Sequence, residues 1–465
     1  MLPGFSSTST SRPSFSASEP LPMPTRVLHL SQRYIFRFWL PLAVMWLMMA
    51  VEQPILSAVI ARLQEPKLNL AAFGVTFSLA LLIESPIIML LVAGTALARG
   101  RQSYRQLLRF TAALSGAITV VHLLVALTPL FGILVGRLVG APEELVEPAR
   151  FAFLLMFPWS AAVAFRRLWQ GIMIRFGKTD QVGVTTIVRL IATATVAFAG
   201  LAFGVLPGAA LAGVALSVGT IAGAAAAYYW TRPILRGPLA RLEAEKDRIS
   251  LRALIDFYVP LALTNVINFL GRPLLTLALS RAILPLESLA LWPVLLSLAF
   301  LFRSIGFAYQ EVVVALLDKQ ESHLALRRFA FTMAFVTTVL LFLLAITPLN
   351  DFWYGRVSGL SRDLVELSRL STLLIALAPA SAFLISWQRG ILVTVRRTRP
   401  ITLAVAINVS VMALSIWLGI RWLAVPGIYL AAAAFMLALL AETIFLSWQA
   451  RLAARRITSL SITPA

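Results

Sequence analysis

The sequence predicts an all-α membrane protein whose twelve transmembrane helices form two parallel six-helix bundles, related by a pseudo-two-fold axis along the membrane normal. Three observations predict this fold. The composition, with 59% hydrophobic residues, 13% charged residues and a mean hydropathy of +0.86, is too apolar for one water-soluble core. Twelve apolar runs are long enough to cross a membrane, and the chain repeats itself at a constant offset of 219 residues.

Each apolar run is a candidate helix because it is continuously apolar and lacks the alternation of a barrel strand. A helix needs about 20 residues to span a hydrocarbon core of about 30 Å, and each run reaches that length. The predicted spans are 34–60, 70–97, 107–135, 149–174, 182–203, 208–231, 253–280, 287–316, 325–348, 365–394, 401–421 and 425–449.

The internal repeat pairs Pro41 with Pro260 near the start of each half, and Pro54 with Pro273 thirteen residues later. The offset holds with no net insertion, so the chain contains two copies of one structural unit. Six spans per copy is an even number, so both copies enter the membrane from the same side, and the cleft between them is the natural binding place. Further pairs are Arg62 and Arg281, Ser78 and Ser297, Thr128 and Thr347, Gly171 and Gly390, and Pro207 and Pro426.

The repeat also divides the chain into regions. The first 33 residues are rich in serine and poor in acids, so we expect a disordered tail, and it lacks the apolar segment of a signal peptide. The connector between the lobes has charges of both signs and is expected to form a short amphipathic helix. The predicted regions are the N-terminal tail (1–33), an N-lobe of spans 1 to 6 (34–231), a cytoplasmic connector (232–252), a C-lobe of spans 7 to 12 (253–450) and a short basic C-terminal tail (451–465).

The loops on one side of the membrane carry 24 Lys and Arg residues, and those on the other side carry nine. By the positive-inside rule, both termini and the connector are cytoplasmic in a multi-pass protein of the cell membrane, inner or plasma. These loops account for most of the net charge of +20, because arginines that flank membrane spans contact anionic lipid headgroups. We therefore expect the lipid bilayer, and not a nucleic acid, as the partner of this charge. The protein is expected to be a monomer.

Several function classes are excluded by what the sequence lacks. It has no cysteine, which excludes disulfides, thiolate metal sites and a cysteine nucleophile, and its three histidines are far apart. It also has no phosphate-binding GK[ST] loop and no HExxH motif. We therefore expect neither an enzyme nor a bound cofactor or metal. The repeat, with prolines at matching places, favours a rocking carrier over a channel.

Ionisable residues inside the predicted spans are the candidates for function, because a charge at mid-membrane costs at least about 2.5–3.5 kcal/mol. The repeat places Glu84 at the position equivalent to Arg303, and Glu52 at the position equivalent to Gly271, one residue before Arg272. The N-lobe thus carries acids where the C-lobe carries bases. The full set is Glu52, Glu84, Arg166, Arg167, Arg189, Arg272, Arg303, Glu311, Arg389 and Glu442.

Each candidate has a functional and a structural interpretation. Glu52, which precedes the helix-bending Pro54, either faces the central cavity or forms an ion pair within the N-lobe. Glu84 either faces the cavity or neutralises an arginine of the opposite lobe, and Arg303 is the expected partner in such a gate. A ligand contact and a structural role both remain open for Arg166, Arg167 and Arg389, and for Arg189 and Glu442, which are also candidates to pair with each other.

A set of spaced residues resembles a known family. They are Phe38, Pro41, Leu42, Glu52, Gln53 and Leu56 in span 1, Phe73, Gly74, Ser78 and Leu79 in span 2, Phe157 and Pro158 in span 4, and Arg272, Pro273, Ser280 and Arg281 in span 7. The chain resembles the multidrug and toxic compound extrusion (MATE) transporters and their multidrug/oligosaccharidyl-lipid/polysaccharide flippase superfamily. Within it, the chain most resembles the progressive ankylosis family, membrane exporters linked to pyrophosphate and nucleotide release. The resemblance covers most of residues 34–450.

This resemblance implies secondary active export of a small anionic solute, bearing phosphate or carboxylate, by alternating access. The positive charge of Arg272 and Arg303 agrees with an anionic solute, because guanidinium groups bind such anions through two parallel hydrogen bonds. The two N-lobe glutamates are suited to bind a coupling H+ or Na+. Two alternatives stay open: a MATE-type antiporter of cations or drugs coupled to H+ or Na+, and a flippase of lipid-linked substrates. The candidate substrate-binding residues are Arg272, Arg303, Glu52, Glu84, Gln53 and Asn268.

Overall fold

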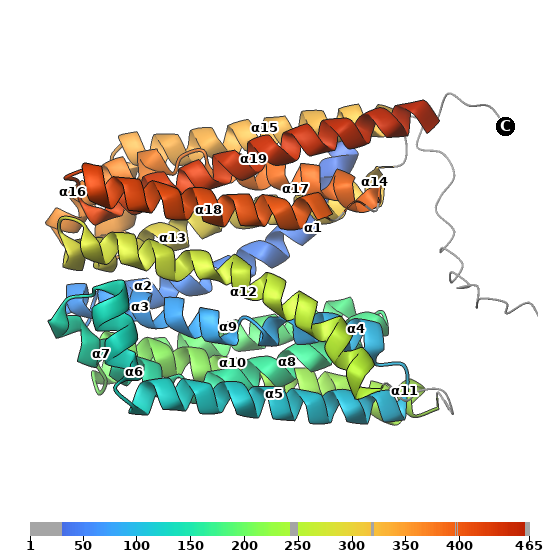
Figure 1. Cartoon of the computed structure of the whole chain (residues 1–465), viewed down its shortest axis with the longest axis horizontal. Coiled ribbons are helices and arrows are strands. Elements are labelled where there is room, and N and C mark those ends of the chain that lie inside the picture. Colours follow the sequence, from blue (N-terminus) through green and yellow to red (C-terminus); the bar gives the residue numbers. More distant parts are fainter. Residues whose placement is uncertain (1–29, 242–249, 318–319, 396, 398, 461–465) are drawn as a thin grey trace, which may run out of the picture.

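The computed structural model describes residues 30–241, 250–317, 320–395, 397 and 399–460; residues 1–29 of the predicted N-terminal tail lie outside this set. The named elements of the described residues are all helices. Eleven helical segments are long and apolar enough to cross a membrane, and the pair α7 and α8, bent by 43°, makes a twelfth. Figure 1 shows most of them in two groups, the blue-to-green N-lobe below and the yellow-to-red C-lobe above, with the blue α1 (Gln32–Ala50) and the yellow-green α12 (Leu251–Arg281) running between the groups. The predicted fold class is therefore confirmed.

The N-lobe comprises the elements up to the connector. They are α1 (Gln32–Ala50), α2 (Glu52–Ile60), α3 (Pro66–Glu84), η1 (Ile87–Met89), α4 (Leu90–Leu97), α5 (Arg101–Leu127), α6 (Leu130–Gly132), η2 (Ile133–Val139), α7 (Glu143–Leu155), α8 (Phe157–Arg175), α9 (Thr179–Phe203), α10 (Gly208–Arg236) and α11 (Pro238–Arg241). The helix predicted for the connector lies mostly outside the described residues, which stop at Arg241 and resume at Ser250.

The C-lobe repeats this order with fewer interruptions. Its elements are α12 (Leu251–Arg281), α13 (Pro285–Phe307), α14 (Tyr309–Leu316), α15 (Gln320–Ile346), η3 (Asp351–Val357), α16 (Arg362–Leu374), α17 (Ala378–Thr394), α18 (Arg399–Trp422) and α19 (Gly427–Leu460). The last helix continues to Leu460, into the stretch predicted as a tail.

Prolines decide where two spans break. Pro54 has no N–H to donate to the carbonyl of Ala50, and the first span divides there into α1 and α2, as predicted. Pro86 likewise leaves the carbonyl of Leu82 free at the end of α3, and the backbone N–H and hydroxyl of Ser85 both bond to it instead. The seventh span, α12, contains two prolines and is nonetheless one continuous helix.

The repeat extends to unusual local geometry. Glu65 and Leu284, at equivalent positions before a helix, both adopt the left-handed conformation that non-glycine residues rarely take, with φ of 48° and 53°. Four residues further along the chain, Asn69 Oδ1 and Ser288 Oγ each accept a hydrogen bond of 3.0 Å from a backbone N–H at the start of their own lobe's sixth-span helix. Two copies of one unit therefore fold by the same local interactions.

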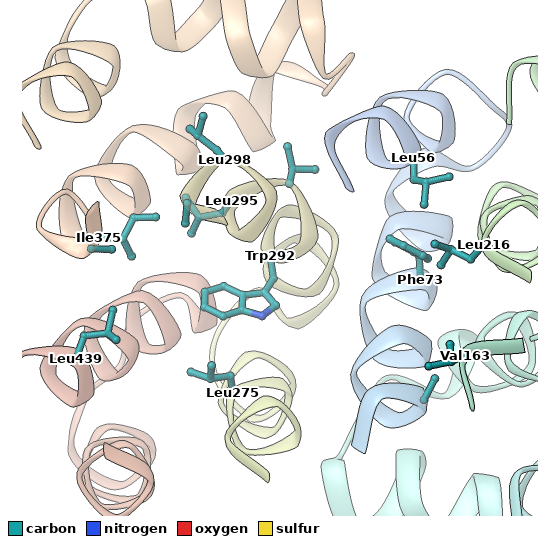
Figure 2. Close-up of a cluster of buried hydrophobic side chains, with 14 of the residues drawn as sticks. Leu56, Phe73, Val163, Leu216, Leu275, Trp292, Leu295, Leu298, Ile375 and Leu439 are labelled. Carbon is teal, nitrogen blue, oxygen red and sulfur yellow. The ribbon is translucent and has the colours of Figure 1, made fainter. Parts of the chain in front are cut away.

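The pseudo-axis passes between α3 and α13. A Cβ built on Gly74 of α3 would lie 2.8 Å from Cγ of Pro293 of α13, the repeat-equivalent residue, so the glycine permits this close crossing. The preceding residues, Phe73 and Trp292, point away from the crossing into the apolar cores of their own lobes, Phe73 toward Leu216 (Figure 2). At this crossing the two lobes approach each other closely, while these two rings pack into the lobe that carries each of them.

The first helix of each half also packs on the opposite lobe. Helix α1 packs mainly against α13, while α12 contacts α3 and η1 as well as its own α18 and α19. Trp39 Nε1 of α1 donates to the Ile305 carbonyl at 2.9 Å, and Tyr258 of α12 donates from its hydroxyl to the Pro86 carbonyl at 2.6 Å. These two hydrogen bonds are repeat-equivalent, and they tie the lobes together.

Candidate functional site

The predicted N-lobe glutamates lie at the two helix breaks. Glu52 is the first residue of α2, where the helix dipole favours a negative charge, and Glu84 is the last residue of α3. Both side chains are buried. Because Pro54 and Pro86 end the preceding helices, the sequence places each carboxylate beside backbone that is not fully hydrogen-bonded within its helix.

Glu52 forms an ion pair within the N-lobe. Its Oε2 accepts a hydrogen bond from Arg189 Nη1 of α9, and its Oε1 accepts one of 3.0 Å from Thr193, one turn further along α9. Helix α10 packs closely over this pair through glycines: a Cβ on Gly223 would lie 3.0 Å from Cβ of Arg189. Of the two interpretations of Glu52, the ion pair is the one that this conformation contains.

Glu84 is not paired with Arg303, so the gate expected from their equivalence is wrong for this conformation. Glu84 Oε1 accepts a 2.6 Å hydrogen bond from Ser160 of α8, and among the described residues no ion pair joins Glu84 to an arginine. The arginine whose charge acts on Glu84 is Arg166, also on α8. Repeat-equivalent positions lie opposite each other only close to the axis, and each of these side chains turns into its own lobe.

The C-lobe contains a second buried pair. Arg389 Nη2 of α17 donates to Glu442 Oε1 of α19 at 2.5 Å, and Asn408 of α18 donates to Glu442 Oε2 at 3.0 Å. The expected pairing of Glu442 with Arg189 is therefore wrong, because each residue has a partner in its own lobe.

Arg272 and Arg303 are arginines within the C-lobe spans that take no part in the ion pairs of the described residues. The Arg272 guanidinium lies over two aromatic rings, at 5.8 Å from Phe77 of the N-lobe and 5.7 Å from Phe269 of its own helix. Arg303 lies 5.2 Å from the rings of both Phe307 and Phe435. Neither arginine has a carboxylate within ion-pair distance among the described residues.

Sequence reasoning missed the aromatic rings around these arginines. Phe269 and Phe307 lie three and four residues from Arg272 and Arg303 on the same helices, a spacing that places side chains on one face. That signal was available. Phe77 and Phe435 come from other helices, and only the packing reveals them.

The remaining predicted residues contribute less. Gln53 is half-buried on α2 beside Glu52, and the side chain of Asn268 on α12 lies outside the part of the chain that the structure describes. Within the described ranges, no three histidine or acidic residues gather to hold a metal ion. In the N-lobe, Arg166 and Arg167 of α8 lie near Arg189, and neither forms an ion pair among the described residues. Two phenylalanine-flanked arginines in the C-lobe and a polar cluster in the N-lobe, in which only Glu52 and Arg189 are paired, therefore make up the candidate site.

Comparison with known proteins agrees with the sequence. The sequence model of the progressive ankylosis protein (ANKH) family matches residues 26–207, which confirms the resemblance. Among curated proteins, none matches the chain. The chain is similar to an inward-facing multidrug resistance MATE family transporter of the MOP superfamily, with a TM-score of 0.67 and 14% identity over 91% of this chain and 100% of that chain. The fold is therefore that of the MATE-type transporters.

Two further structures show the same fold. An outward-facing multidrug resistance MATE transporter of the MOP superfamily has a TM-score of 0.57 and 14% identity, covering 93% of this chain and 97% of that chain. A MOP superfamily transporter from Pyrococcus furiosus Vc1, whose binding pocket is described as having reverse polarity, has a TM-score of 0.57 and 13% identity, covering 96% and 100%.

Proposed function

We propose that this protein is a secondary active transporter that exports a small anionic solute, bearing phosphate or carboxylate, by alternating access. The fold supports such transport, because it consists of two lobes whose first helices each pack on the opposite lobe. The observation that carries the choice of substrate is the state of Arg272 and Arg303, two half-buried cations in the C-lobe spans with no acid at ion-pair distance in the described chain.

The cost of an unpaired cation inside a membrane span supports a binding role. Insertion of an arginine at mid-membrane costs about 2.5–3.5 kcal/mol, and a cation–π contact returns about 0.5–2 kcal/mol. A ring also binds only the face of the guanidinium, so the N–H groups at its edge stay available. An anionic substrate that accepts two parallel hydrogen bonds from such an edge supplies the missing charge compensation.

The partners of the buried acids argue against a cation or drug antiporter. Such a carrier needs uncompensated acids to attract its substrate, and Glu84 is the one buried acid without an ion pair among the described residues. Glu52 already has Arg189 and Thr193 as partners. Glu84 retains one hydroxyl partner, Ser160, and it is the acid that we propose binds the coupling H+ or Na+. Of the ten ionisable residues in the spans, six are arginines and four are glutamates, so the net balance is positive.

We further propose a monomer in the cell membrane, with both termini in the cytoplasm. The unequal distribution of basic residues between the two sets of loops supports this orientation. No catalytic constellation suggests an enzyme. A flippase of lipid-linked substrates shares the fold and the anionic headgroup chemistry, and the transport assay below separates it from a carrier of free solutes.

Arginine substitution in proteoliposomes tests the proposal. Arg272→Ala and Arg303→Ala are each expected to weaken uptake of small phosphate- and carboxylate-bearing solutes by about tenfold to a hundredfold in apparent affinity, the effect of losing charged hydrogen bonds. Arg272→Lys and Arg303→Lys keep the charge but lose the planar fork, so an intermediate affinity is expected. Uptake is to be measured with and without a gradient of H+ or Na+.

Arg421→Ala is the matched control. Arg421 also lies over two rings, those of Trp417 and Trp422, but it is exposed at the end of α18. Its loss is expected to leave affinity unchanged. Wild-type affinity for every transported anion in both C-lobe variants would remove the assignment of these arginines. Transport of organic cations alone would favour the antiporter, and movement of lipid-linked anions alone would favour the flippase.

A further inference from the structure

Two arginines cross from one lobe to the other and cap the same element on the opposite side. Arg62, just after α2, donates through Nη2 to the carbonyls of Arg356 and Val357 at 2.7 and 2.9 Å. Arg281, the last residue of α12, donates through Nη2 to the carbonyls of Arg137 and Leu138 at 3.2 and 2.7 Å. Each donor and each acceptor in one contact is offset by 219 residues from its counterpart in the other.

The acceptors are the ends of two short π-helices, η2 and η3. Carbonyls in the last turn of a helix lack partners within it and carry the negative end of the helix dipole, so a guanidinium compensates both. Each π-helix ends next to a glycine with positive φ, Gly140 at 81° and Gly359 at 75°. A Cβ on Gly140 would lie 3.0 Å from Arg281 Nε, so the glycine also makes room for the arginine.

The reciprocal contacts of Arg62 and Arg281 belong to one state of the protein, in which the lobes are together on this side. An isologous contact, in which residue i meets j and j meets i, requires two units related by a two-fold axis. Both arginines lie on the less basic side, predicted to face outward, and both join the lobes there. Two further polar contacts also join the lobes: Lys67 pairs with Asp363, and Ser280 Oγ donates to the Val139 carbonyl at 2.6 Å. Any separation of the lobes on this side breaks all of them together.

We propose that Arg62 and Arg281 form a reciprocal latch that holds the outward side of the cleft closed and releases when the carrier opens outward. This inference rests on the proposed alternating-access transport and names the element that regulates it. The latch uses donors from one lobe and helix carbonyls from the other, so it stabilises the closed outer side without a charged acceptor that would compete with an anionic substrate. The similarity to an inward-facing transporter is consistent with a closed outer side.

Distances between spin labels test the latch. The chain has no cysteine, so Phe203→Cys and Trp422→Cys, exposed and equivalent sites at the ends of α9 and α18, report the outer side. Asp180→Cys and Arg399→Cys, exposed at the opposite ends of these helices, report the inner side. We expect Arg62→Ala or Arg281→Ala to raise the ratio of outward-open to outward-closed protein about tenfold, and the double variant to raise it about a hundredfold if the two arms act independently.

Arg150→Ala is the matched control. Arg150 Nε of α7 donates to the Ala126 carbonyl of α5 at 2.7 Å, an arginine–carbonyl contact within one lobe, so its loss is expected to leave both distances unchanged. Arg62→Lys with Arg281→Lys keeps the charge with fewer donors and is expected to shift the ratio by less than the alanine pair. This second variant remains informative if the alanine pair does not fold.

The outcomes separate the latch from the proposed transport. Unchanged outer distances in both double variants, or an equal shift in Arg150→Ala, would overturn the latch whatever the flux. A widened outer distance in protein that moves no anion in proteoliposomes would sustain the latch as a closing contact and would contradict the proposed substrate class.

Discussion

The buried ion pair of Glu52 and Arg189 sets a measurable part of the stability of the N-lobe. Glu52→Gln removes the negative charge and keeps nearly the same side-chain shape. Arg189 is then left buried, with Arg166 and Arg167 close enough to repel it. The two side chains are 6% and 11% exposed, so solvent screens little of the loss. Breaking such a pair from one side costs about 3–5 kcal/mol.

Thermal unfolding in detergent converts this cost into a midpoint shift. An unfolding entropy of about 2.1 cal/mol/K per residue gives about 1 kcal/mol/K for the 465-residue chain, so Glu52→Gln is expected to lower the midpoint by about 3–5 °C. Arg189→Gln alone is expected to lower it as well, because it leaves a buried carboxylate. The double variant removes both charges and is expected to recover most of the loss.

The double-mutant cycle decides whether the pair contributes as a pair. If the shifts of the two single variants simply add in the double variant, the coupling is absent and the reasoning fails. The pair of Asp351 and Arg369 is the control, with a hydrogen bond of 2.7 Å between side chains that are about half exposed. Screening by solvent and salt makes a coupling there small, so we expect its variants to leave the midpoint nearly unchanged.

Two other predictions concern packing and backbone satisfaction, both measured by the same midpoint. Gly219→Ala is expected to destabilise strongly, because its Cβ would lie 1.9 Å from Thr193 Oγ1 and 2.9 Å from a backbone oxygen of α9; Gly116→Ala, with nothing within 4 Å, is expected to stabilise by about 0.4–1 kcal/mol. Tyr258→Phe is expected to cost about 1–3 kcal/mol by leaving the Pro86 carbonyl unpaired, whereas the exposed Tyr229→Phe should cost almost nothing; equal midpoints would contradict the hydrogen bond's role.

The fold could be predicted from the sequence because the apolar runs are long and the repeat makes them redundant. Each span covers about 20 apolar residues, and the repeat tests every assignment twice. The break at Pro54 was also predictable, since a missing N–H acts within one turn. The continuity of α12 through Pro260 and Pro273 was not, because neighbouring helices decide whether a proline interrupts a span or only bends it.

The partners of the charged residues were harder to predict from the sequence. The sequence places Glu84 and Arg303 at equivalent positions, and this equivalence suggested a pair across the cleft. In the structure, rotation of each side chain about its helix decides the outcome, and Ser160 receives Glu84. Helix rotation depends on contacts with several neighbours, such as the close approach of α10 at Gly223, which the spacing of residues along one helix does not contain.

Symmetry is kept where the lobes meet and lost at the buried ion pairs. The arginines that cap the opposite lobe occur in both copies at one offset, because a two-fold contact serves both arms equally. The buried ion pairs do not occur at equivalent positions in the two copies. They join spans 1 and 5 in the N-lobe but spans 10 and 12 in the C-lobe. The anion proposed as substrate would impose no two-fold requirement, and an asymmetric charge distribution would give it one preferred orientation. The equivalents of the paired residues are neutral: Gly271 for Glu52, Asn408 for Arg189, Gln170 for Arg389 and Gly223 for Glu442.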